Sequence, residues 1–143
     1  MPIDEELLGV YPTQRTVFYF ENIEHDEDRR KPHYHIAIKT NNNTYILVVM
    51  FTSKVKKREA HRLSNPDAYT SLVYADETDF DFLTEPSVID CNDPIYKTQD
   101  ELSAIMDNLQ PIETYIPDEF IDKIITAIKT SPIVRPYIKK SLN

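Results

Sequence analysis

The chain has 143 residues, the length of one domain, and can bury a hydrophobic core without disulfides or metals. Hydrophobic residues make up 41% of the sequence and charged residues 28%, which excludes a mostly disordered chain. The net charge of −8 argues against a general nucleic-acid coat, and the single glycine excludes glycine-rich phosphate loops.

Three segments in the first half of the chain have the composition of β-strands. Residues 16–23 are rich in β-branched and aromatic side chains, and residues 33–39 alternate between two faces. Residues 45–52 are continuously apolar, which is typical of a strand buried on both faces. Between the last two segments, the asparagines at 41–43 predict a tight turn, because asparagine tolerates positive φ. We therefore expect a β-hairpin over 33–52.

The middle of the chain is more polar. Residues 54–67 predict a basic connection with a short helical turn. Short strands are expected at 71–74 and at 87–90, with Asp, Asn and Pro in place of glycine at the turns. The strands of the sheet are therefore expected to end near residue 90.

Helical patterns occupy the C-terminal third. Thr98 and Glu101 form a T-x-x-E capping box, and apolar residues follow at helical spacing from Leu102 to Leu109. A second helix is expected after Pro117, with an apolar stripe from Phe120 onwards, and Pro132 should end it. A short segment at 134–142 follows. Strands first and helices last predict an α+β fold with a mainly antiparallel sheet.

The whole chain, 1–143, is expected to form a single domain that is strand-rich over 14–92 and helical over 98–142. No apolar run reaches the roughly 18–20 residues that a membrane span needs. Acids at positions 4–6 stand where a secretory signal would be basic. We expect a cytoplasmic protein with no membrane partner, in which Cys91, the only cysteine, is buried and structural.

Positive charge is concentrated in residues 29–62, which contain nine Lys and Arg residues and one acid, Glu59. Such asymmetry predicts an anion-binding face on an otherwise acidic body, unless acids neutralise the patch in space. The basic residues are Arg29, Arg30, Lys31, Lys39, Lys54, Lys56, Lys57, Arg58 and Arg62.

The two ends of the predicted hairpin carry the most specific pattern. Residues 29–31 are basic and precede its first strand, and Thr52, Ser53 and Lys54 end its second strand. In an antiparallel hairpin these two ends lie side by side. Hydroxyls next to cations suit the binding of a phosphate and the stabilisation of a phosphodiester transition state. The alternative is that the hydroxyls only satisfy nearby backbone groups.

His33 and His35 are two residues apart on a predicted strand and therefore point the same way. This spacing suits a proton-transfer pair or two metal ligands, for which His61 or an acid would have to supply a third. A surface pair without a special role is the alternative. We predict no metal and no cofactor.

Several short motifs together resemble the PemK/MazF-like toxin family over roughly residues 16–140. They are Lys31-Pro32 before the apolar strand at 34–38, the buried strand that ends in Thr52-Ser53, the segment 86–91, and a late helix that runs into residues 130–132.

The resemblance implies an SH3-like β-barrel with flanking helices. It also implies a metal-independent endoribonuclease toxin that cleaves single-stranded RNA by attack of the 2′-hydroxyl on the adjacent phosphate. Members of this family are usually paired with an antitoxin, which we expect to be acidic, and often form homodimers. The catalytic arginine of the family falls at Lys31, with Arg30 as the substitute, and its threonine falls at Thr52. His33 or His35 would act as general acid or base, an inference from the histidine pKa range.

Two alternatives stay open. The first is a non-catalytic module on the same fold, whose basic face binds an anionic or protein partner. The second follows from residues 32–36, which also resemble the His-hydrophobic-His metal motif of rolling-circle and relaxase nucleases. Those enzymes need a helical tyrosine nucleophile, for which Tyr137 is the candidate here. Dependence on a divalent metal would favour this alternative.

Overall fold

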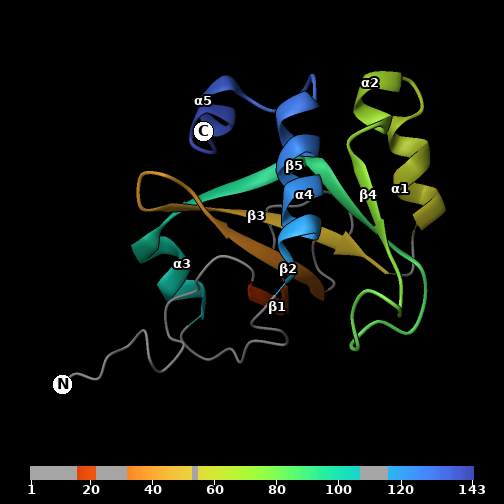
Figure 1. Cartoon of the computed structure of the whole chain (residues 1–143), viewed down its shortest axis with the longest axis horizontal. Coiled ribbons are helices and arrows are strands. Elements are labelled where there is room, and N and C mark those ends of the chain that lie inside the picture. Colours follow the sequence, from red (N-terminus) through yellow and green to blue (C-terminus); the bar gives the residue numbers. More distant parts are fainter. Residues whose placement is uncertain (1–15, 22–31, 53–54, 107–115) are drawn as a thin grey trace.

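A computed structural model describes residues 16–21, 32–52, 55–106 and 116–143 (Figure 1). The fold is α+β, as predicted, with a five-stranded antiparallel sheet in the order β1-β2-β3-β5-β4. The elements in chain order are β1 (Thr16–Glu21), β2 (Pro32–Lys39), β3 (Thr44–Phe51), α1 (Val55–Arg62), α2 (Pro66–Tyr69), β4 (Leu72–Ala75), β5 (Ser87–Thr98), α3 (Gln99–Met106), α4 (Asp118–Thr130) and α5 (Pro136–Lys140).

Strands β2 and β3 form the predicted hairpin. Their register runs from Tyr34 opposite Met50 to Lys39 opposite Tyr45. In the turn, Asn43 has a φ of 62°, and the backbone N–H of Thr40 donates to the carbonyl of Thr44 at 2.9 Å. Asparagine therefore takes the left-handed position that glycine usually fills.

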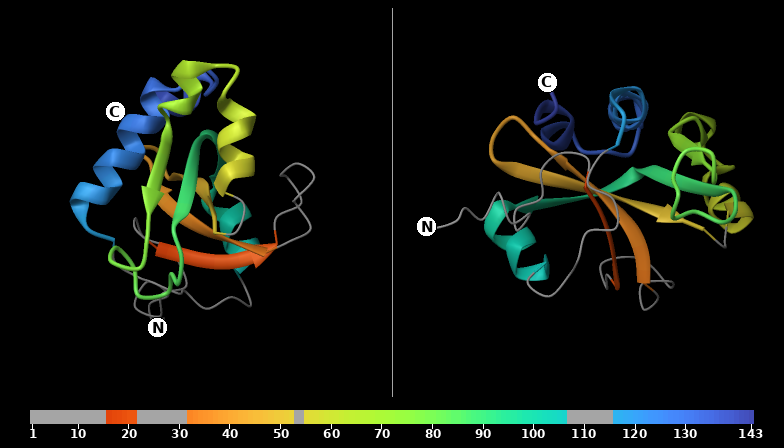
Figure 2. Two further views of the ribbon diagram at one scale, coloured as in Figure 1. Left: turned by 90° about the vertical axis from the view of Figure 1, so that its right-hand side faces the viewer. Right: turned by 60° about the horizontal axis from the view of Figure 1, so that its bottom comes forward.

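Both faces of the sheet are covered. Ile46, Val48 and Met50 of β3 face one core, to which α4 and α5 contribute. Leu47 and its alternate neighbours face a second core that includes Leu102 of α3. Figure 2 shows α4 and α5 on one side of the sheet and α3 on the other. Burial on both sides explains why β3 is continuously apolar.

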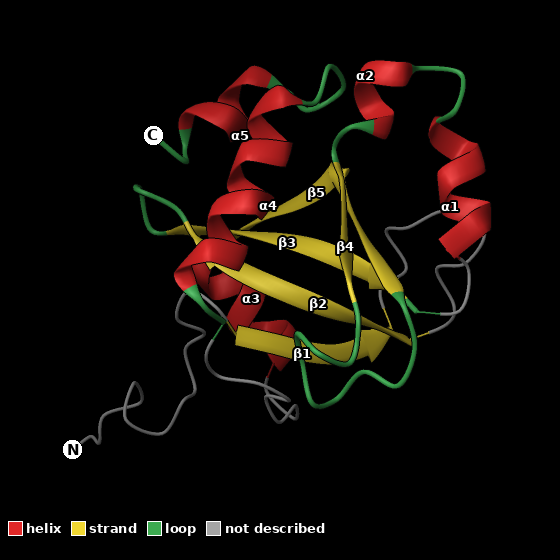
Figure 3. Ribbon diagram, turned by 45° about the vertical axis from the view of Figure 1, so that its right-hand side comes forward, coloured by secondary structure: helices red, strands yellow, loops and turns green. Residues whose placement is uncertain are grey.

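The sheet is open within the described residues, so the closed SH3-like barrel is not confirmed. Strands β1 and β4 are its edges and each pairs with one described strand. Figure 3 shows this twisted sheet with α4 beside β4. The loop after β4 folds back on β2, where the Tyr34 ring lies 4.6 Å from that of Phe82 and 4.7 Å from that of Tyr19. Aromatic packing therefore connects the two ends of the sheet.

The predicted start of the first C-terminal helix is confirmed. The backbone N–H of Thr98 donates to Glu101 Oε1 at 2.8 Å, and the backbone N–H of Glu101 donates to Thr98 Oγ1 at 3.1 Å. These bonds satisfy N–H groups that a helix start leaves without partners. The predicted continuation to Leu109 lies outside the described residues.

The second predicted helix is confirmed as α4, which buries Phe120, Ile124 and Ile128 and ends before Ser131. The expected short segment after it contains α5. The described part of the chain has no helix of the length and apolarity that crossing a membrane requires.

Two predictions about the middle of the chain were too short. The connection after β3 contains two helices, α1 and α2, in place of one helical turn. Strand β5 continues past Asp90 to Thr98, with a shift of register between Leu47 and Val49 of β3. The polar residues and the proline at 90–94 look like the end of a strand, but the sheet accommodates them as an irregular segment within β5.

A candidate anion-binding groove at the hairpin end

The start of β2 and the end of β3 lie side by side, with Tyr34 opposite Met50. The predicted convergence of the two strand ends is therefore confirmed for the strands themselves. Five of the predicted site residues lie outside the described residues: Arg29, Arg30, Lys31, Ser53 and Lys54.

Thr52 lines an open groove of about 610 Å³ at this end of the hairpin. Helix α1 contributes Lys56 and Lys57, both exposed, to the same groove. Three of the predicted site residues are thus brought together. The carboxylates of Glu59 and Glu85 also line the groove, so its described walls carry both signs of charge.

Arg58 and Arg62 point elsewhere, towards a buried carboxylate. Arg58 lies over the Phe51 ring, 4.1 Å from its centroid, with Nη1 3.4 Å from Asp90 Oδ2. Arg62 donates to the same oxygen from Nε at 3.1 Å and from Nη2 at 3.0 Å. Asp90 is only 2% exposed. The two arginines therefore balance a charge inside the fold, although the sequence predicted them as RNA contacts.

Asp90 belongs to a buried polar chain that the sequence analysis missed. Its Oδ1 accepts from the backbone N–H of Asn92 at 3.0 Å and from Asn92 Nδ2 at 2.9 Å. Ser131 Oγ donates to Asn92 Oδ1 at 2.6 Å, and Lys139 Nζ donates to the Ser131 carbonyl at 2.6 Å. This chain ties α1, β5 and the α4–α5 connection together. An aspartate within an apolar strand is the one sequence feature that pointed to it, because a buried charge needs partners.

The two histidines lie on the face of β2 opposite Tyr34. His35 is fully buried, and its Nδ1 donates to the His33 carbonyl at 2.8 Å. The half-buried His33 ring packs 5.0 Å from that of Phe51. His35 is therefore closed to a substrate in this conformation, and of the two rings only that of His33 is partly accessible.

Tyr137, the candidate nucleophile of the metal-nuclease alternative, lies on α5. Its ring makes an edge contact with that of Tyr96 at 5.2 Å, and Tyr96 packs against the core on the α4 face. The sheet therefore lies between Tyr137 and the two histidines. In the described part of the chain, no three His, Cys, Asp or Glu side chains are grouped to hold a metal.

Cys91 is buried at the start of the irregular segment of β5. Burial, with a smaller contribution from the neighbouring Asp90 charge, raises the pKa of its thiol. This environment agrees with the predicted structural role, because the thiolate is the reactive form.

No family model matches this chain, and no curated protein matches its sequence. The resemblance to PemK/MazF-like toxins therefore depends on the short sequence motifs, and the case for the groove depends on its geometry.

Proposed function

We propose that the chain is a metal-independent endoribonuclease of the MazF type that holds the backbone of single-stranded RNA at the end of the β2–β3 hairpin. One observation carries the proposal: Thr52, Lys56 and Lys57 line one groove at this hairpin end. In the sequence, Lys31 directly precedes β2, and Ser53 and Lys54 directly follow Thr52. A hydroxyl among several cations is a chemistry that suits the RNA backbone.

The proposed reaction needs no group from outside the protein. The RNA 2′-hydroxyl attacks the adjacent phosphorus, the bond to the 5′-oxygen breaks, and the products are a 2′,3′-cyclic phosphate and a 5′-hydroxyl. Lys31, with Arg30, would stabilise the charge on the phosphorane, and the Thr52 hydroxyl would donate to a phosphate oxygen. His33 is the better candidate for moving the proton, because His35 is fully buried.

The proposal has further parts at the level of fold and partners. The open sheet would correspond to the SH3-like sheet of the family, and the site of action would be the cytoplasm. An acidic antitoxin would compete with RNA for the lysines, and a homodimer would be the active assembly.

Cleavage of a long unstructured RNA by the full chain in EDTA tests this proposal. The wild type should give discrete fragments that end in cyclic phosphates. Thr52→Ala and Lys31→Ala should lower the rate by about 100-fold, the usual effect of removing one donor to a developing oxyanion. Lys129→Ala, on the exposed last turn of α4, is the control and should cleave like the wild type. Intact RNA with the wild type, or cleavage only when manganese is added, would refute the proposal.

A second candidate is a non-catalytic module that binds an anionic or protein partner. Glu59 and Glu85 favour it, because two carboxylates next to the lysines weaken the attraction of the groove for phosphates. Tight RNA binding by the wild type with no product under any metal condition would support this candidate over the ribonuclease.

A further inference from the structure

Strand β4 is an edge of the sheet, and its backbone offers hydrogen-bonding groups on the side away from β5. The backbone N–H of Cys91 donates to the carbonyl of Ser71 at 3.1 Å. Because antiparallel pairs alternate, Val73 also directs its backbone groups at β5, and Leu72 and Tyr74 direct theirs outwards. No described strand pairs with this outer edge. An edge of this kind is a template for an added strand.

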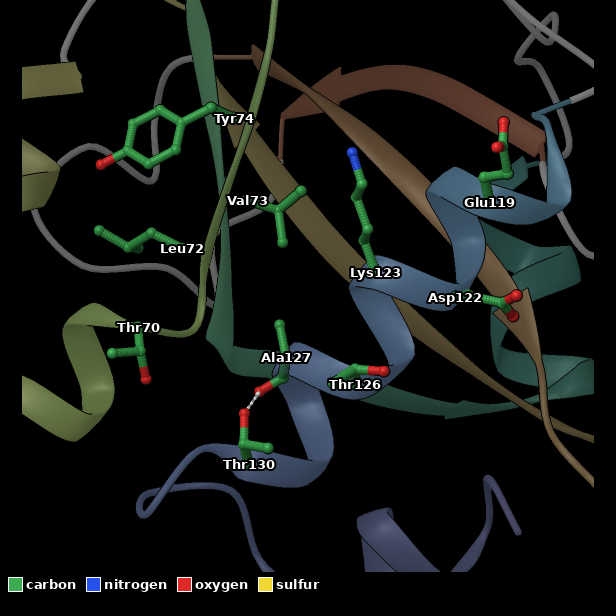
Figure 4. Close-up of a pocket in the computed structure, with 10 residues that line it drawn as sticks. All are labelled: Thr70, Leu72, Val73, Tyr74, Glu119, Asp122, Lys123, Thr126, Ala127 and Thr130. Atoms are coloured by element: carbon green, nitrogen blue, oxygen red, sulfur yellow. Dashed lines mark hydrogen bonds between the residues drawn. The ribbon is translucent and has the colours of Figure 1, made fainter.

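The outer edge of β4 borders a groove of about 580 Å³. Helix α4 forms the opposite wall, and Figure 4 shows Val73 of β4 and Lys123 and Ala127 of α4 around the space between these elements. Val73 and Ala127 are small and almost fully buried, so they leave room above them for the side chains of a guest. Thr130 does not obstruct the groove, because its hydroxyl donates back to the Ala127 carbonyl at 3.3 Å.

The surroundings of the groove are acidic. Glu119 and Asp122 of α4 line it against one cation, Lys123. A smaller cavity of about 120 Å³ shares Glu119 and Lys123 with the groove and adds Asp79 from the loop after β4. That loop, residues 76–81, contains four acids and follows directly on β4. A guest with positive side chains would therefore be favoured along the whole groove.

We infer that the groove between β4 and α4 binds an extended basic segment of another protein, which adds to the sheet as a strand beside β4. The outward groups of Leu72 and Tyr74 would pair with its backbone, and alternate lysine or arginine side chains would reach Glu119, Asp122 and Asp79. A second copy of the chain is the less suitable guest, because each copy has a net charge of −8.

Amide hydrogen exchange of the full chain tests this inference residue by residue. The probe is an octapeptide amide that alternates lysine and valine, and a glutamate–valine octapeptide is the charge control. Saturation with the lysine peptide should slow exchange at the amides of Leu72 and Tyr74 by tenfold or more. The amides of Val73 and Ala75 already point at β5 and should change little. Unchanged exchange at Leu72 and Tyr74, or equal protection by both peptides, would overturn the inference.

A pair of substitutions at Tyr74 separates the backbone from the side chain. Tyr74→Pro removes the outward N–H, which an edge strand tolerates, and Tyr74→Ala keeps it. The lysine peptide should bind Tyr74→Pro about tenfold more weakly than Tyr74→Ala, and thermal unfolding of both variants checks their folding. Equal affinity for two folded variants would refute the strand pairing. Protection at Leu72 that rises with protein concentration without peptide would assign the edge to a second copy and overturn the inference.

Discussion

The guanidinium of Arg62 donates two hydrogen bonds to a single oxygen of Asp90, from Nε at 3.1 Å and from Nη2 at 3.0 Å. Arg58 approaches the same oxygen from the preceding turn of α1. Two cations of the basic segment are therefore used to hold α1 against β5. Their role in stability can be measured separately from any role in RNA binding.

Replacing Asp90 should be strongly destabilising. Asp90→Asn leaves two nearby guanidinium groups without their counter-charge, and breaking a buried ion pair costs about 3–5 kcal/mol. Urea unfolding measures the loss. Asp81→Asn, on the exposed loop after β4, is the matched control and should stay within about 0.5 kcal/mol of the wild type. Similar stabilities for the two variants would show that Asp90 does not support the fold.

Asn43 should tolerate glycine better than alanine. Its φ of 62° lies in the left-handed region, where a Cβ atom without a compensating polar group costs about 1–2 kcal/mol. Asn43→Ala should lower the free energy of unfolding by about that amount, and Asn43→Gly should leave it nearly unchanged. Equal losses in the two variants, measured by thermal unfolding, would count against the described turn.

The capping box at α3 should make stability depend on pH in the acidic range. The hydrogen bond from the Thr98 backbone N–H holds the pKa of Glu101 below its ordinary value of 4.5. A depressed pKa in the folded state stabilises the protein above the unfolded-state value, and this contribution is lost as the pH falls through the folded value. The melting temperatures of the wild type and Glu101→Gln should therefore differ more at pH 7 than at pH 3. A constant difference would contradict this assignment.

Cys91 should react with a thiol reagent only when the protein opens. Burial keeps its thiol away from solvent and raises its pKa, so little thiolate is present at neutral pH. Ellman's reagent should modify the native chain slowly and the chain in concentrated urea rapidly. Fast modification of the native protein would show that this part of β5 is more open than described.

Local features of the fold were predictable from the sequence. The Thr98–Glu101 capping box and the Asn43 turn depend on side chains that bond to backbone only a few residues away. The length of β5 was not predictable, because Asp90 and Asn92 resemble a loop until Ser131 and Arg62 are known to be their partners. Those partners are far away in the sequence.

The candidate site shows the same limit. Thr52, Lys56 and Lys57 are close in sequence, and they line one groove. Arg58 and Arg62 are equally basic, but they are four residues apart on α1 and share the face that packs against Asp90. Composition alone does not distinguish the solvated face of a helix from a face that meets a buried carboxylate.

The salt dependence of RNA binding tests the central claim, that Lys56 and Lys57 contact RNA phosphates beside Thr52. The ligand is a short fluorescent 2′-O-methyl RNA, whose blocked 2′-oxygen prevents cleavage, and affinity is measured by anisotropy over a series of KCl concentrations. Each lost phosphate contact lowers the slope of log K against log salt by about 0.7 for a single strand. Lys56→Ala/Lys57→Ala should therefore have a slope shallower than that of the wild type by about 1.4. Lys129→Ala/Lys140→Ala, with the same net charge, should keep the wild-type slope; equal slopes for the two double variants would contradict the account.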